Sequence, residues 1–166
     1  MSEKGGKSYI FSVLWRWLIA LVLTAMVLAN LFTHVFQIVN YNGIGMEPSL
    51  QGGQTLVILK TKDVQQGDII AFYYNNQVLG RRVICEGGKQ LEMKQDGTVL
   101  INGAALEEAY VPEHSLGQCN IPFPYQVQMD TVFVMGDNRT AALDSRLSEI
   151  GTIPIDRIIG KVILTF

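Results

Sequence analysis

The order of apolar and polar residues divides the chain into one long apolar run and a series of short blocks. Residues 17–33 contain no ionisable side chain, and the next formal charge after Arg16 is Glu47. The 23 residues from 17 to 39 would extend about 34 Å as a helix, which exceeds the hydrocarbon thickness of roughly 30 Å. This pattern predicts one membrane-spanning helix near the N-terminus.

A cleaved secretory signal is the alternative interpretation of this run. The basic residues before it fit a signal, but the run is longer than the usual ~7–15 residues. Residues 33–37 (Thr-His-Val-Phe-Gln) also lack the small residues of a cleavage site, and His34 there is interpreted as an interfacial residue. The pattern favours a retained anchor over 15–39, preceded by a cytoplasmic tail over 1–14 and followed by a domain over 40–166.

The charge distribution predicts how the chain is oriented in the membrane. Lys4, Lys7 and Arg16 against Glu3 give the first 16 residues a net charge of +2, so the remainder carries −4 of the total of −2. Basic residues flank the cytoplasmic end of a span, so the N-terminus is expected inside and the C-terminal domain outside. The acidic domain has no basic stripe, which argues against a nucleic-acid partner.

After residue 40 the pattern becomes that of short strands separated by Gly, Pro and Asn. Blocks rich in β-branched and aromatic residues alternate with turn signals such as 75–77 (Asn-Asn-Gln) and 95–97 (Gln-Asp-Gly). A single helical turn is expected within 104–110. The predicted strands are 55–59, 68–73, 78–85, 90–94, 99–101, 132–135 and 158–166. The fold class expected is mainly β, an antiparallel barrel or folded sheet behind one transmembrane helix.

The cysteines and histidines give little sign of a metal or a redox centre. Cys85 and Cys119 are 34 residues apart, and a disulfide between them and two separate core thiols both remain open. No Cys/His cluster has metal-ligand spacing, so neither a metal nor another cofactor is expected. His114, between Pro112 and Glu113 on one side and Ser115 on the other, is interpreted as a solvated loop residue.

Four motifs follow the apolar run in order. They are Gly-Ile-Gly-Met-Glu-Pro-Ser-Leu at 43–50, Gly-Asp-Ile-Ile-Ala-Phe at 67–72, Gly-Arg-Arg-Val-Ile at 80–84, and Met-Gly-Asp-Asn-Arg at 135–139, the last continuing through Asp-Ser-Arg at 144–146. Together, in this order, they closely resemble the conserved boxes of type I signal peptidases of the Gram-positive kind. The resemblance covers essentially the whole chain and implies a β-rich domain on the outer membrane face.

The resemblance also implies where a catalytic site would stand. In that family a serine before the Met of the first box is the nucleophile, and a lysine before the Arg of the hairpin box is the base. A further serine orients that lysine. These three positions are occupied here by Gly45, Arg81 and Ala142. Glycine offers no nucleophile, and an arginine guanidinium stays protonated in proteins, so no catalytic residue is expected.

Two serines near these positions are candidate replacements for the missing nucleophile. Ser49 stands where the family usually has a threonine and is interpreted as turn packing, and Ser145 is interpreted as structural. The resemblance implies that Met46 and Leu50 line a peptide-binding cleft. It implies a charged scaffold, with Asp144 and Arg146 paired near the site; its members are Asp137, Asn138, Arg139, Asp144, Ser145 and Arg146.

Three functions are compatible with these residues. The leading hypothesis is a non-catalytic chaperone for exported preproteins, in particular pilin subunits, because relatives of this family without the nucleophile occur in pilus clusters beside sortases. Arg81 would then contact a partner's carboxylate or carbonyl, or be solvated or paired in the core. The alternatives are an active signal peptidase with a non-standard nucleophile and a regulatory partner of an active one. No small-molecule cofactor is expected.

Overall fold

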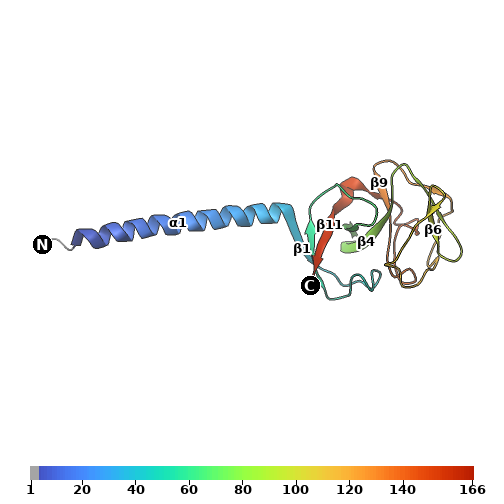
Figure 1. Ribbon diagram of the computed structural model, residues 1–166, viewed down its shortest axis with the longest axis horizontal. Helices are drawn as coiled ribbons and strands as arrows, with labels where there is room; N and C mark the ends of the chain where they lie inside the picture. The colour runs from blue at the N-terminus through green and yellow to red at the C-terminus, as the bar shows by residue number, and fades with distance from the viewer. Residues whose placement is uncertain (1–3) are drawn as a thin grey trace. The chain divides into compact units, whose positions relative to one another are not determined.

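The computed structural model describes residues 4–166, with side chains described from Phe11 onward. The chain forms two compact units, one extending to Phe36 and the other comprising Gln37–Phe166. The first unit is built on one long helix, α1 (Lys4–Val35), shown in blue in Figure 1. Within it, Phe11–Val35 is long and apolar enough to cross a membrane, and none of its most apolar window is buried in the protein.

Helix α1 ends at Val35, four residues before the predicted end of the helix at residue 39. Phe36–Asn40 forms strand β1, which pairs with β2 (Thr55–Leu59) at one edge of the larger sheet. The prediction of helix up to residue 39 was therefore wrong at its end. Residues 36–40 form a strand instead of helix because pairing with β2 supplies their backbone groups with hydrogen-bond partners from a distant segment.

The second unit is a mainly antiparallel β structure, so the predicted fold class is confirmed (Figure 1). A seven-stranded sheet has the order β1-β2-β11-β3-β4-β9-β10, and a four-stranded sheet has the order β7-β6-β5-β8. The remaining strands are β3 (Ile69–Tyr74), β4 (Gln77–Glu86), β5 (Gln90–Met93), β6 (Val99–Ile101), β7 (Ala104–Ala105), β8 (Tyr125–Gln126), β9 (Thr131–Met135), β10 (Ile153–Pro154) and β11 (Ile158–Thr165). A 3-10 turn, η1 (Ile155–Arg157), joins the last two.

The β3–β4 hairpin is the centre of the larger sheet, and its turn follows from two asparagines. Asn75 and Asn76 have φ values of 47° and 59°, and they join strands whose last pair is Tyr74 opposite Gln77. Two successive positive φ values define the turn type that matches the twist of a two-residue hairpin, and Asn tolerates them well. The predicted turn is confirmed, and it sets the register that places Arg81 opposite Ile70.

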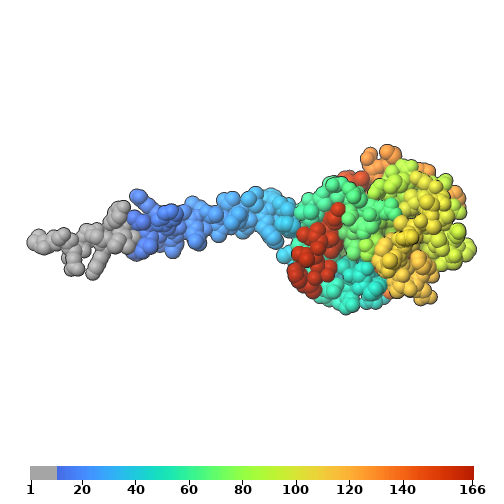
Figure 2. All heavy atoms as spheres, in the orientation of Figure 1, coloured from blue at the N-terminus to red at the C-terminus, as the bar shows by residue number. Residues whose placement is uncertain are grey.

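Three clusters of buried apolar side chains hold the β-domain together. One joins the two sheets through β4, β5 and β9 and includes Ile84, Leu91 and Phe133. A second lies around Phe72 and Ile158. The third packs Tyr41 among residues of β2 and β3. The end of the chain, red in Figure 2, lies at the surface, where Phe166 is 74% exposed.

Two expectations from the sequence are corrected or settled by the fold. The helical turn expected within 104–110 is absent, because Ala104–Ala105 pairs with β6 and the chain then turns. Cys85 and Cys119 are both free thiols, so the structure contains two separate thiols and no disulfide between them. Burial raises the pKa of Cys85 to about 11, which makes its thiol a poor nucleophile at neutral pH.

Candidate functional site

The three positions identified from the sequence converge in space, although they come from separate elements. Gly45 lies in the turn after β1, Arg81 in the middle of β4 and Ala142 in the loop after β9. A β-carbon built at Gly45 would lie 3.1 Å from Nη2 of Arg81 and 3.2 Å from Cα of Ala142. The fold therefore assembles the constellation that the motifs implied, with these residue types in it.

Backbone contacts fix the Gly45 turn against the loop that follows β9. The Asn138 amide donates to the Gly45 carbonyl at 3.1 Å, and the Asn138 side chain donates to the Ile44 carbonyl at 3.3 Å. A β-carbon at Gly136 would collide with the Gly45 carbonyl and with Ala142. Gly136 is thus required by close backbone approach, and the loop cannot retreat from Gly45 without losing these bonds.

Arg81 fills the space beside Gly45 and is almost completely buried, with 4% of its surface exposed. Its Nε donates to the Leu143 carbonyl at 2.8 Å, and its Nη1 donates to the Gly80 carbonyl. Among the described residues no carboxylate forms an ion pair with it. Arg81 thus brings a protonated, hydrogen-bond-donating group to the place where catalysis would need a proton acceptor.

Tyr41 is a member of this site that no sequence pattern indicated. Its ring is 1% exposed, and its hydroxyl is the one fully enclosed side-chain polar atom without a hydrogen-bond partner in the described part of the chain. Burial raises the pKa of Tyr41, and the nearby charge of Arg81 partly offsets that effect. The Tyr41 hydroxyl and the Arg81 guanidinium therefore lie close to each other.

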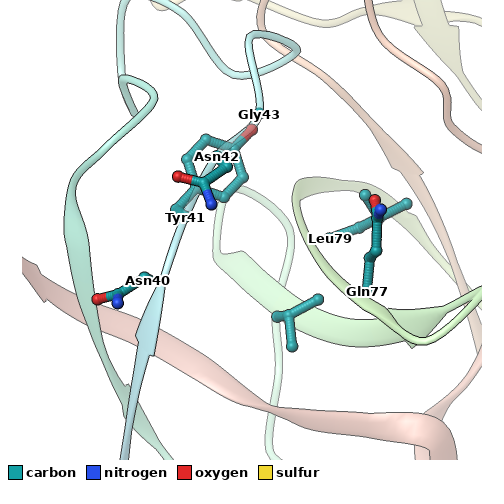
Figure 3. Close-up of a pocket in the computed structure, with 7 residues that line it drawn as sticks. Asn40, Tyr41, Asn42, Gly43, Gln77 and Leu79 are labelled. Carbon is teal, nitrogen blue, oxygen red and sulfur yellow. The ribbon is translucent and has the colours of Figure 1, made fainter.

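A cavity of about 360 Å³ opens beside these residues, between residues 40–43 and residues 77–79 (Figure 3). The first segment continues from β1, and the second is the start of β4. Strand β9 pairs with β4 only from Arg82 onward, so the preceding residues of β4 have a free edge on that side within the described structure. Such an edge can accept an extended peptide as an added strand.

Met46 and Leu50 are not among the residues that line this cavity. Their side chains are 0% and 1% exposed and pack in the third core cluster with Tyr41. The turn at residues 45–50 directs them inward, where burial of apolar surface stabilises the domain. The cavity wall is formed instead by the segments on either side of it.

Comparison with known proteins identifies the family to which this chain belongs. Residues 14–166 match the family described as "Signal peptidase, peptidase S26". The chain belongs to this family. It is 32% identical to signal peptidase I T of Bacillus subtilis, over 84% of this chain and 78% of that protein. It is 34% identical to a probable signal peptidase I-1 of Synechocystis, over 89% of this chain and 80% of that protein.

A solved structure shows the same relationship at the level of the fold. The crystal structure of a signal peptidase I from Enterococcus faecalis is 28% identical, with a TM-score of 0.50. The match covers 61% of this chain and 97% of that one. The chain is therefore a signal peptidase I-like protein with an apolar N-terminal helix.

The charged scaffold expected of a signal peptidase forms a buried network. Asp137 is fully buried and accepts two bonds from Arg82, at 2.8 and 2.6 Å. Asp144 likewise accepts two bonds of 2.8 Å from Arg146. It also accepts the Gly136 amide at 2.9 Å. Bidentate pairs of this kind hold planar groups in one orientation, so they fix the loop after β9.

Two partners in this network were not identifiable from the sequence. Arg139 pairs with Glu108, which lies 31 residues earlier, and Arg82 stacks on Tyr110 with 4.0 Å from its guanidinium carbon to the ring centre. Burial and the charge of Glu108 raise the pKa of Tyr110 far above its usual range. A loop segment with no periodicity carries both residues, so no sequence signal pointed to them.

The hydroxyl groups of Ser49 and Ser145 are hydrogen-bonded elsewhere, and His114 is an exposed loop residue. Ser49 Oγ accepts from Arg82 at 3.2 Å. Ser145 Oγ is fully buried and accepts the Val134 amide at 3.0 Å. His114 is 46% exposed and lies 3.9 Å from a Glu108 oxygen. The described residues also contain no group of three or more metal-ligating side chains.

Proposed function

We propose that this chain is a non-catalytic member of the signal peptidase family that binds exported polypeptides at the outer face of the membrane. The observation that carries the proposal is that Gly45 and Arg81 adjoin each other at the position of a Ser–Lys site. A β-carbon at Gly45 would lie 3.1 Å from the arginine nitrogen Nη2. A Ser–Lys site needs a hydroxyl beside a base that can lose its proton. Here one position has no side chain and the other stays protonated.

The cavity beside this pair supports a binding role. It offers the free edge of β4 on one side and the backbone of residues 40–43 on the other. Main-chain hydrogen bonds give affinity for an extended chain with little dependence on its sequence. A protein that has such a groove but lacks catalytic residues would bind a polypeptide without cleaving it.

The orientation and the partners follow from the same proposal. The basic residues before the helix support an orientation with the N-terminus in the cytoplasm, in which the β-domain would meet polypeptides as they leave the membrane. The partners proposed are exported preproteins, and more specifically pilin subunits destined for sortase. A regulatory contact with a separate, active signal peptidase is the competing partner.

Cleavage of a preprotein tests the absence of catalysis. The purified full chain in detergent is incubated with a preprotein, beside a Gly45→Ser/Arg81→Lys/Ala142→Ser variant and an active signal peptidase. We expect no product from the natural chain, and product only from the active enzyme or the restored variant. Loss of a catalytic serine lowers rates by about 10⁶, so specific turnover by the natural chain would refute the proposal in favour of an unrecognised nucleophile.

Binding assays separate the proposed partners. The same protein, in detergent and with the helix intact, is tested against a purified pilin precursor, an unrelated preprotein and an active signal peptidase. Preferential binding of the pilin supports the assembly role. Binding of the peptidase alone would assign the chain as its regulatory partner.

A further inference from the structure

A second cavity, of about 580 Å³, lies on the seven-stranded sheet. It shares no residue with the cavity between residues 40–43 and residues 77–79. It is formed where the end of β3 meets η1 and the start of β11. Two of its side chains are cationic and one is acidic, whereas the domain as a whole is acidic. The lining residues are Lys62, Tyr73, Asp156, Arg157, Ile158 and Ile159.

Lys62 supplies a fixed ammonium group at one wall of this cavity. Its Nζ donates to the backbone carbonyl of Asp156 at 2.8 Å and to that of Ile158. An ammonium group has three N–H donors, so one of them is left for another acceptor. Lys62 forms no ion pair within residues 4–166. Its positive charge is therefore held in place by carbonyl groups but is not neutralised.

Arg157 and Asp156 complete the charge of the cavity. Both are exposed, and neither forms an ion pair in the described part of the chain. Lys62 and Arg157 against Asp156 leave a net charge of +1. A guanidinium group matches the geometry of a phosphate group, because two parallel N–H groups can donate to two of its oxygens. The cavity thus suits a ligand with one phosphate charge.

Tyr73 connects the cavity to the end of the β-domain that lies next to the membrane-spanning segment in the chain. Its hydroxyl accepts from Gln37 Nε2 at 3.4 Å, so its own hydrogen is left to donate. Gln37 follows the end of α1 at Val35 by two residues, which extend at most about 7 Å. A helix that spans the bilayer up to Val35 therefore keeps Gln37 at the level of the lipid headgroups. The Tyr73 side chain is 61% exposed, as is common for tyrosine at a membrane interface.

We infer that Lys62, Tyr73 and Arg157 form a binding site for the phosphate group of an anionic phospholipid. Arg157 donates from its guanidinium, Lys62 from its third N–H, and Tyr73 from its hydroxyl. A lipid headgroup is favoured over an acidic protein, because the short connection from Val35 to Gln37 keeps this end of the domain at headgroup depth. The inference does not depend on peptide binding.

A headgroup bound here would orient the proposed peptide groove. Tyr73 pairs with Val78 across the β3–β4 hairpin, and Val78 lines the cavity beside residues 40–43. A lipid held at Tyr73 therefore fixes the height of that edge of the groove above the bilayer. The two sites share no residue, so a failure of one leaves the other standing.

Chemical protection of Arg157 tests the inference on the full chain in nanodiscs. One preparation contains phosphatidylcholine alone, and the other contains phosphatidylcholine and phosphatidylglycerol at three parts to one. Phenylglyoxal, an uncharged reagent, modifies exposed arginines, and mass spectrometry of the Arg157 peptide gives the rate. A basic residue near an anionic lipid surface gains about fivefold in binding, so modification should be about fivefold slower with phosphatidylglycerol. Equal rates in the two preparations would overturn the site.

A third preparation distinguishes a lipid headgroup from a soluble phosphate ester. Glycerol phosphate is added in excess to the nanodiscs of phosphatidylcholine alone. Protection of Arg157 that is absent, or weaker than that given by phosphatidylglycerol, supports the lipid. Protection equal to that given by phosphatidylglycerol would assign the cavity to soluble phosphate esters and overturn the lipid assignment.

Variants locate the effect in the cavity. Lys62→Gln removes one charge and should weaken the headgroup about fivefold, so most of the protection is lost. Tyr73→Phe changes only a hydroxyl on an exposed ring, and it tests the site even where Lys62→Gln does not fold. Lys94→Gln, at an exposed lysine outside the cavity, is the matched control. Loss of protection in either site variant but not in Lys94→Gln supports the site. Protection that survives in both site variants, or that Lys94→Gln loses equally, contradicts it.

Discussion

Arg81 and Gly45 form one packing unit: the arginine nitrogen Nη2 lies 3.1 Å from the point where a β-carbon at Gly45 would stand. That distance is tighter than ordinary van der Waals contact. The guanidinium therefore occupies room that a serine at position 45 would need, and each residue restricts what the other position can be. A glycine at 45 is compatible with the long, charged side chain at 81, whereas a larger residue at position 45 is unfavourable while Arg81 is present.

Gly45→Ser alone should destabilise the domain. Crowding against Arg81 and the Ala142 backbone is expected to lower the free energy of unfolding by about 1–3 kcal/mol. Adding Arg81→Lys should relieve part of this loss, because the lysine has no guanidinium plane beside residue 45. Urea unfolding of the four proteins in a double-mutant cycle measures the coupling.

Gly52→Ser is the matched control for that cycle. A β-carbon there would meet its nearest atom at 3.7 Å, so the change should be nearly neutral. An additive cycle, with no coupling between positions 45 and 81, would contradict the packing relationship.

The scaffold pair Arg82–Asp137 should contribute strongly to stability. Asp137 is fully buried, and Asp137→Ala would leave Arg82 without the carboxylate that it contacts at 2.6 Å. Breaking a buried pair from one side costs about 3–5 kcal/mol, read as a loss in the free energy of unfolding. Lys89→Ala, which breaks the half-exposed pair with Glu86, should cost only about 0–1 kcal/mol. Similar losses in both variants would contradict a structural role for the scaffold.

Leu50 should behave as a core residue. With 1% of its surface exposed, Leu50→Ala is expected to lower the free energy of unfolding by about 2–5 kcal/mol. Leu164→Ala removes a leucine that is 54% exposed and should have little effect. A Leu50→Ala variant that keeps its stability but loses peptide affinity would show that Leu50 contributes to the peptide-binding groove and not to the core.

Stability should fall at alkaline pH through Cys85. Its pKa is raised by burial to about 11, from an ordinary value of 9.0, so the unfolded chain loses this proton first. The contribution of the neutral thiol to the free energy of unfolding is therefore complete below pH 9 and is lost as the pH rises toward 11. Cys85→Val lacks this dependence, so its stability relative to the natural chain should increase between pH 8 and pH 10.5 in urea unfolding. Parallel pH profiles for the two proteins would show that the thiol does not couple to folding.

Local patterns predicted much of the β-domain because they report directly on local structure. The strands at 55–59 and 99–101 and the Asn75-Asn76 turn appear as expected, since β-branched blocks and turn residues act within a few positions. The short strands β8 and β10 were not predicted. A strand of two residues is too short to show an alternating pattern of apolar and polar residues. Such a strand forms only because a distant segment pairs with it.

The sequence by itself determined the family, the apolar helix, the mainly β fold and the residue types at positions 45, 81 and 142, because motifs and periodicity are properties of the chain. The tertiary structure alone decided that these three positions meet, that Tyr41 joins them and that Met46 and Leu50 turn inward. It also decided that Arg81 has no carboxylate partner among the described residues. The physical reason is that burial and charge pairing depend on which distant segments come into contact, and no local pattern encodes those contacts.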